Sequence, residues 1–267
     1  MNIVVPLTSD DLQTINISTD RRYLVGVVKE SSAALDLSGV SPDELAAGPK
    51  LLPFGRVERT SYGFAWNGTI EAPGAAAVRL HFSNFFLPNN ATITLSGAGE
   101  SFSYTGFGPD GSGDFWSNTL RGDTVNLRVE YRGNDLGRVM RALRFAVAEV
   151  GPISPRLPVA DPQAGDQLCP YNEPCVLNAS CVTLPSAVTT ATKAVAMILF
   201  ISGPYQYVCS GGLIADSDPN TNIPYFMTAN HCLSSNKEAQ TVEAYFDYKS
   251  ACGTCDDGIS DEPRTLG

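Results

Sequence analysis

The sequence predicts an all-β protein: an N-terminal antiparallel β-sandwich of jelly-roll type, followed by a second β domain. Three observations lead to this prediction. Several short segments alternate apolar and polar side chains, as strands with one buried face do. Turn-forming residues separate these segments at short intervals. The composition, with only 17% charged residues and 24 glycines, favours strands and turns over long solvated helices.

The clearest alternation lies in the first half of the chain. In residues 78–82 the apolar side chains occupy every second position, which predicts one buried face and one face that carries Arg79 and His81 to solvent. We interpret His81 as a solvated surface histidine. The same pattern recurs in three further segments, 93–95, 125–131 and 143–147. Such strands, with turns between them, are typical of an antiparallel sandwich.

Three smaller features of this region have a structural interpretation. Ser41 can cap a helical turn that opens with Pro42. Phe115 and Trp116 are interpreted as core residues and not as a ligand platform, because large aromatic side chains are mostly buried. The Arg-Gly-Asp segment at 121–123 is interpreted as a turn between two strands, in preference to an integrin-binding motif.

A proline-rich stretch divides the chain. The four prolines of residues 151–162 exclude a central strand or a helix there. A chain of 267 residues has room for about two domains. We therefore expect a β-sandwich domain at 1–150, a semi-rigid linker at 151–168 and a second domain at 169–267. Processing cuts fall in linkers of this kind, and Arg156 is one candidate position.

The second domain has its own strand pattern. Residues 193–201 are apolar on both faces, as expected of a strand inside a barrel wall. Residues 205–208 are expected to pair back after a Ser-Gly-Pro turn, and residues 242–248 form a further alternating strand. This order predicts one β-barrel.

Charge and hydropathy exclude several classes of partner. The net charge of −10 and the isoelectric point of about 4.6 argue against binding to nucleic acid or to an anionic membrane. Both of these partners are negatively charged and would repel an acidic protein surface. No apolar run approaches the roughly 20 residues of a membrane helix, so no membrane insertion is expected. The N-terminal residues do not show the pattern of a signal peptide.

The seven cysteines all lie at or after Cys169. Cysteines concentrated in this way predict disulfides formed in an oxidising compartment, and an odd number leaves one without a partner in this chain. The pair Cys252 and Cys255 also has the spacing of a redox or zinc motif. The turn-forming residues 256–258 replace the helix that a redox pair needs, and zinc needs more ligands than one such pair. We therefore expect no metal and no cofactor.

Residues 209–232 contain the strongest chemical signal. They read CSGGLIADSDPNTNIPYFMTANHC, with a Gly-rich start, a polar loop, a short apolar segment and then His231 between Asn230 and Cys232. Histidine is the side chain that accepts and returns a proton near neutral pH, so His231 is the candidate general base.

This segment resembles the chymotrypsin-like (trypsin-like) serine proteases, on the residues C-S-G-G-L-I and T-A-N-H-C. Within them it is most similar to the secreted bacterial lysyl endopeptidase type, in which a longer polar loop, here 215–224, precedes the Tyr-Phe run. The resemblance implies that the second domain is the first β-barrel of a trypsin-like two-barrel domain, with His231 as its catalytic base. The stretches 82–93 and 113–131 also resemble the β-sandwich that precedes the catalytic domain in many secreted bacterial serine proteases.

The same resemblance implies disulfide partners. It pairs Cys209 with Cys232, so that the His231 loop is pinned. It joins Cys181 to Cys252 or Cys255, and it joins Cys175 to a part of the protease beyond this sequence. Cys169 is additional to the pattern, and we expect it to pair with whichever of Cys252 and Cys255 remains.

The other two members of a serine-protease triad are not visible in the sequence. The triad order in this family is His, Asp, Ser, and no Gly-Asp-Ser-Gly segment follows His231. Asp247 comes too early for the triad aspartate, and Asp256, Asp257 and Asp261 lie in a turn-rich tail. We therefore expect the sequence to end before the triad Asp and Ser, so that this chain alone is inactive.

Together these features predict a secreted, extracellular serine-type endopeptidase precursor, a monomer that acts on protein or peptide substrates. The β-sandwich is expected to be its prodomain or an accessory domain. A preference for Lys or Arg is what the resemblance implies. The alternative is a non-catalytic extracellular binding protein that joins a β-sandwich to a degenerate protease-like module.

Overall fold

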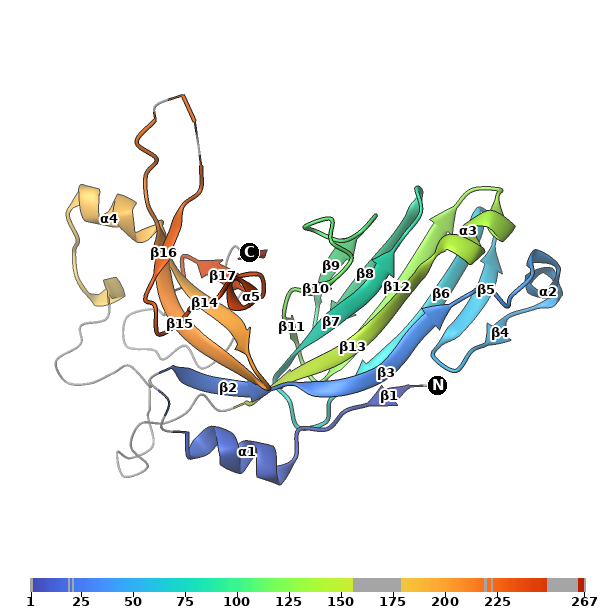
Figure 1. Ribbon diagram of the computed structural model, residues 1–267, viewed down its shortest axis with the longest axis horizontal. Coiled ribbons are helices and arrows are strands. Elements are labelled where there is room, and N and C mark those ends of the chain that lie inside the picture. Colours follow the sequence, from blue (N-terminus) through green and yellow to red (C-terminus); the bar gives the residue numbers. More distant parts are fainter. Residues whose placement is uncertain are drawn as a thin grey trace. The chain divides into compact units, whose positions relative to one another are not determined.

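The computed structural model describes residues 2–18, 20, 22–155, 179–218, 220–221, 223–248 and 264–266. Strands dominate these residues, and the predicted all-β class is confirmed. Two compact units make up the chain. The sandwich unit comprises Met1–Thr8 and Val27–Ile153, and the second unit comprises Ser9–Gly26 and Ser154–Gly267. Figure 1 labels the helices and strands of both.

The sandwich unit contains two sheets. The first has the strand order β4 (Lys50–Leu51), β5 (Arg56–Thr60), β6 (Gly63–Glu71), β12 (Thr124–Arg132), β8 (Ala91–Gly97) and β9 (Glu100–Tyr104), with β1 (Ile3–Val4) parallel to β6. In the second, β7 (Ala77–Phe86) pairs on one side with β10 (Phe115–Trp116) and β11 (Leu120–Arg121), and on the other with β13 (Arg144–Ile153). The strand β3 (Lys29–Asp36) pairs with β13.

The predicted alternation places apolar side chains between these two sheets. On β12, Leu127 and Val129 are buried, and Leu127 pairs with Leu95 of β8. Across the sheets, the ring of Trp66 on β6 lies 5.7 Å from the ring of Phe145 on β13. Apolar side chains from both sheets thus form one core, which holds the sandwich together.

Two short helices complete the sandwich unit. The predicted helical turn after Ser41 is confirmed as α2 (Pro42–Ala47), in which the Ser41 and Glu44 side chains form a capping box. The helix α3 (Leu136–Ala142) begins after Asp135, whose side chain accepts from the backbone N–H of Arg138. The Arg-Gly-Asp segment is a turn between β11 and β12, as predicted.

The prediction that Arg79 and His81 point to solvent is wrong. Arg79 is fully buried, and its Nε donates to the carbonyl oxygen of Ser117 at 3.0 Å. His81 lies between two carboxylates, with Nδ1 2.7 Å from Glu149 Oε2 and Nε2 2.9 Å from Asp114 Oδ1. The segment that contains Asp114 and Ser117 runs back along β7 and covers these side chains. The alternation of apolar and polar residues within β7 does not reveal that a later segment will cover its outer face.

Phe115 and Trp116 are buried, which confirms their interpretation as core residues. The Trp116 ring also stacks on the imidazole of His81, with the ring centroids 5.0 Å apart and the planes 9° from parallel. The short strand β10 therefore covers one face of His81 while the neighbouring carboxylates bind its edges.

The strands of the second unit form a curled antiparallel half-barrel. Their order is β2 (Tyr23–Val27), β15 (Tyr205–Leu213), β14 (Val195–Ser202), β17 (Glu243–Phe246) and β18 (Arg264–Leu266), with β16 (Phe226–Thr228) also on β15. The strands predicted at 193–201, 205–208 and 242–248 correspond to β14, β15 and β17. Gly203, with a φ of 58°, makes the turn between β14 and β15.

The helices of the second unit are short: α1 (Ser9–Asn16), α4 (Ser186–Thr192), α5 (Asn236–Ala239) and the 3₁₀ turn Ala179–Cys181. None of the helices in the described part of the chain is long and apolar enough to span a membrane.

Residues 9–26 pack in the second unit, although they precede the sandwich strands in the sequence. The expectation that prolines keep residues 151–162 out of a central strand is wrong for the first three of them, because β13 continues to Ile153 and Pro152 lies opposite Val78 of β7. Residues 156–168 of the predicted linker, Arg156 among them, lie outside the described residues. The division of the chain into a domain at 1–150, a linker at 151–168 and a domain at 169–267 stays a prediction.

Candidate active site

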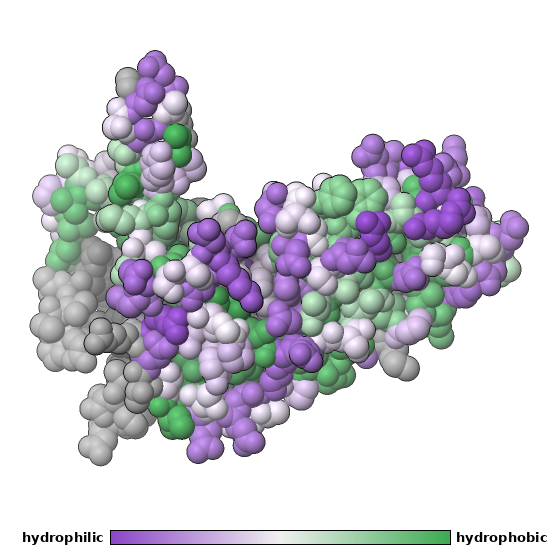
Figure 2. Space-filling view, in the orientation of Figure 1, coloured by the Kyte–Doolittle hydropathy of each residue, from purple (hydrophilic) through white to green (hydrophobic). Residues whose placement is uncertain are grey.

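His231 follows β16, a short strand that pairs with the end of β15. The antiparallel register places Thr228 opposite Gly211, and Thr228 Oγ1 donates to the carbonyl oxygen of Ser210 at 2.8 Å. The loop that joins β15 to β16 projects from the sheet (Figure 1), and its end is hydrophilic (Figure 2). Pairing of β16 with β15 brings the residues after Thr228 back beside Cys209.

Gly211 allows β16 to approach β15 closely. A Cβ at this position would lie 2.8 Å from the carbonyl oxygen of Met227 and would overlap the ring of Phe226. Gly212 has more space, because the nearest atom to a Cβ there is the carbonyl oxygen of Ala194, at 3.3 Å. The glycine at 211 is therefore required by the packing that positions the His231 turn.

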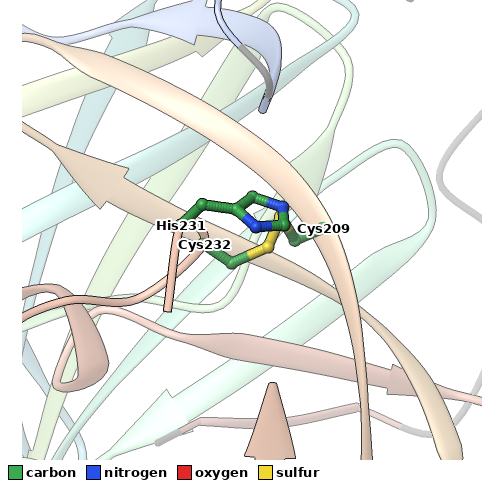
Figure 3. A group of neighbouring side chains, drawn as sticks. All are labelled: Cys209, His231 and Cys232. Carbon is green, nitrogen blue, oxygen red and sulfur yellow. A yellow bond between two sulfur atoms is a disulfide. The ribbon is translucent and has the colours of Figure 1, made fainter. Parts of the chain in front are cut away.

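The turn after β16 holds His231 at the surface. The backbone N–H groups of Cys232 and Leu233 both donate to the carbonyl oxygen of Ala229, at 2.9 and 3.2 Å. Cys232 is buried and forms a disulfide with Cys209 of β15, with their Cα atoms 6.2 Å apart. The exposed His231 side chain lies beside this disulfide (Figure 3). Hydrogen bonds on one side and a covalent bond on the other thus restrain the backbone at His231.

The disulfide also decides whether this group can bind a metal ion. One ligand atom each from Cys209, His231 and Cys232 lie within 4.8 Å of one another. Zinc and other soft metals bind cysteine as a thiolate. The two sulfur atoms are bonded to each other here, so neither offers a thiolate and the cluster does not fit a metal.

Within the described residues, the His231 ring makes no hydrogen bond to a carboxylate. Asp247 follows β17 in a turn and has a left-handed backbone, at a φ of 57°. The remaining acidic candidates after His231 that the sequence analysis named, Asp256, Asp257 and Asp261, lie outside the described residues, as do Cys169, Cys175, Cys252 and Cys255. Cys181 is disulfide-bonded.

Glu238 organises the residues that follow the His231 turn. Its Oε2 accepts from the backbone N–H of Ser234 at 2.8 Å and of Ser235 at 3.1 Å, and from both of their hydroxyls. Its Oε1 accepts from Ser202 Oγ of β14 at 2.6 Å. Burial raises the pKa of Glu238, but the hydrogen bonds from Ser202, Ser234 and Ser235 outweigh it and lower the pKa to about 2. The carboxylate therefore joins the His231 segment to β14 as an anion.

Arg22 binds the same carboxylate from the N-terminal segment. Its Nη1 lies 3.7 Å from Glu238 Oε1, and its guanidinium carbon lies 4.0 Å from the ring centroid of Tyr207 on β15. Its Nε and Nη2 donate to the two oxygens of Asp20, at 3.1 and 2.8 Å. Arg22 is therefore held by a fork to Asp20, a cation–π contact and an ion pair.

Sequence reasoning missed both Glu238 and Arg22. A signal for Glu238 existed, because Ser235 and Glu238 have the spacing of a capping box, and the structure contains that box at the start of α5. No comparable signal existed for Arg22, since Tyr207 and Glu238 are distant from it in the sequence.

A separate cavity of about 430 Å³ lies between α4 and strands β14 and β15, and His231 is not among the residues that line it. The lining residues are mainly apolar or hydroxyl side chains: Ser180, Val182, Leu184, Thr189, Thr192, Val195, Ala196, Met197, Ser210, Asp247 and Tyr248.

Comparison with known proteins finds a similarity within the second unit. Residues 171–266 match the family model for the lysyl endopeptidase C-terminal domain. No curated protein matches the chain. No solved structure matches it either. The matched region contains the β15–β16 pairing, the disulfide and His231. Over these residues the chain is therefore similar to the lysyl endopeptidases, a family of proteases.

Proposed function

We propose that this chain is the N-terminal part of a secreted serine-type endopeptidase, in which His231 is the general base of a His-Asp-Ser triad. The observation that carries the proposal is the position of His231. Within the region that matches the family model, this exposed imidazole lies on a turn held by the Ala229 carbonyl and the Cys209–Cys232 disulfide. The β-sandwich is then a prodomain or an accessory domain, and processing occurs in the linker that follows β13.

The chemistry requires an imidazole that is both accessible and oriented. A serine hydroxyl is a weak nucleophile until a histidine removes its proton, and the same histidine returns that proton to the leaving amine. The exposed ring of His231 can be approached by a serine on another segment, whereas its backbone is restrained at Cys232. An aspartate that orients the imidazole and a nucleophilic serine would complete the proposed triad.

Substrate preference follows from the family that matches. The family is named for lysyl endopeptidase activity, and we propose a preference for lysine here, on protein or peptide substrates. The net charge of −10 supports this preference, because an acidic protein attracts basic substrates. Secretion is supported by the disulfides at Cys181 and at Cys209–Cys232, which form in oxidising compartments. We propose that the protein acts as a monomer.

Labelling by a serine-directed fluorophosphonate tests the proposed activity. In the full-length natural protein that carries this sequence, the reagent should label one serine, and His231→Ala should abolish labelling because the serine loses its base. His81→Ala is the matched control, because His81 is the only other histidine and lies in the sandwich unit. Equal labelling of wild type and His231→Ala would contradict the role of His231. Absence of labelling in wild type would favour the non-catalytic binding protein.

A further inference from the structure

The chain passes between its two compact units three times. Residues up to Thr8 belong to the sandwich unit, residues 9–26 to the second unit, residues 27–153 to the sandwich unit again, and the residues from Ser154 onwards to the second unit. The segment 9–26 is therefore continuous at both of its ends with the sandwich unit. One cut after Ile153 would leave this segment attached to the sandwich unit, while its packing partners would be on the other fragment.

The segment is an integral part of the second unit's sheet. Its strand β2 is hydrogen-bonded to β15, the strand that carries Cys209. Leu24 and Val25 of β2 are 3% and 1% exposed, and the carbonyl oxygen of Val25 accepts from Ser154 N at 2.8 Å. Ile15 of α1 is fully buried. Strand pairing and apolar burial together resist removal of the segment.

Arg22 adds a specific contact to this pairing. The side chains of Arg22 and Glu238 are 18% and 12% exposed, so water screens their 3.7 Å ion pair only in part. Tyr207 holds the guanidinium from one face, and Asp20 binds its edge through two hydrogen bonds. Glu238 in turn holds Ser234 and Ser235, which come directly after the His231 turn. Arg22 of the N-terminal segment thus contacts Glu238, the residue that holds the segment after His231.

We propose that residues 9–26 are an internal binding segment for the second unit, which keeps the two fragments of a cleaved chain together without a covalent bond. The site for the segment is the backbone edge of β15 opposite β14, together with Tyr207 and Glu238, and its occupant is the strand β2 with Arg22. This holds whether or not His231 is catalytic.

The distribution of cysteines makes the proposal testable. All seven lie at or after Cys169, so no disulfide can join a fragment that ends before that residue to the remainder. The experiment inserts the recognition sequence of a site-specific protease within residues 156–168 of the full chain. The purified, oxidised protein is then cut and passed over a size-exclusion column. We expect both fragments to elute together, and to separate only in denaturant.

Substitution of Arg22 tests the specific contact. Arg22→Ala removes the ion pair and the cation–π contact, and we expect it to raise the dissociation constant of the cut fragments about tenfold. Arg59→Ala, at an exposed arginine of β5 in the sandwich unit, is the matched control and should leave the constant unchanged. Circular dichroism before the cut shows that each variant is folded.

Hydrogen exchange distinguishes this segment from any other contact between the fragments. In the cut complex, we expect the backbone amides of β2 to remain protected. Separation of the wild-type fragments in native buffer would overturn the proposal. Fragments that stay together with unprotected β2 amides, or with equal dissociation constants for wild type and Arg22→Ala, would also overturn it.

Discussion

At the scale of single residues, the structure shows how a half-buried carboxylate holds the segment that follows an exposed imidazole. His231 is restrained through its backbone, and the residues after it are held by Glu238 through four contacts from Ser234 and Ser235. The same carboxylate reaches Ser202 of β14 and Arg22 of the N-terminal segment. Because all of these groups donate or are cationic, the site requires Glu238 as an anion.

The ionisation of Glu238 predicts a loss of stability in acid. Its pKa falls from a usual value of 4.5 to about 2 in the folded chain, so its stabilising contribution is complete above pH 4.5 and is lost as the pH falls from 4.5 to 2. We expect the unfolding temperature of the second unit to decrease across this range, and Glu238→Gln to remove that part of the decrease. Glu30→Gln, at an exposed glutamate in the sandwich unit, is the control. Identical pH profiles for wild type and Glu238→Gln would refute this role.

At the scale of structural elements, β10 is the least predictable part of the sandwich. It is a two-residue strand, and the structure fixes it through side chains: Trp116 stacks on His81, and Asp114 and Glu149 bind the two nitrogens of the ring. Through its two ring nitrogens, His81 joins β7 to β13 and to the segment before β10.

Substitution of His81 measures the strength of this junction. His81→Leu leaves two facing carboxylates without their shared donor, and we expect it to lower the free energy of unfolding of the sandwich unit by about 1 to 3 kcal/mol. Trp116 is one of only two tryptophans, so its fluorescence reports on β10 during denaturant unfolding. His231→Leu, in the other unit, is the control and should leave this transition unchanged. An unchanged unfolding midpoint in His81→Leu would show that the junction contributes nothing.

At the scale of the whole molecule, patterns within one strand were predictable and contacts between distant segments were not. Alternation along residues 125–131 identified β12, because burial of every second side chain follows from strand geometry. The same rule failed for Arg79, whose cover comes from Ser117 and its neighbours. The sequence likewise identified His231 from its local motif but not Arg22, whose partners lie far along the chain.

Processing links the two proposals for the molecule. If residues 9–26 remain in the second unit after a cut in the linker, the sandwich unit stays attached to the domain that contains His231. Release of an active protease would then require removal of β2 from β15, in addition to cleavage. The central claim, however, concerns the chemistry of His231.

The kinetics of ester hydrolysis test that claim most directly. The measurement is kcat/KM of the full-length natural protein on a lysyl ester, for wild type, His231→Ala and His81→Ala. Loss of the general base should lower kcat by about 10⁴-fold or more with little change in KM, because the histidine acts in the transition state. His81→Ala should stay within about threefold of wild type, because a change of that size is below 1 kcal/mol. Retention of wild-type kcat in His231→Ala would contradict the assignment of this residue as the catalytic base.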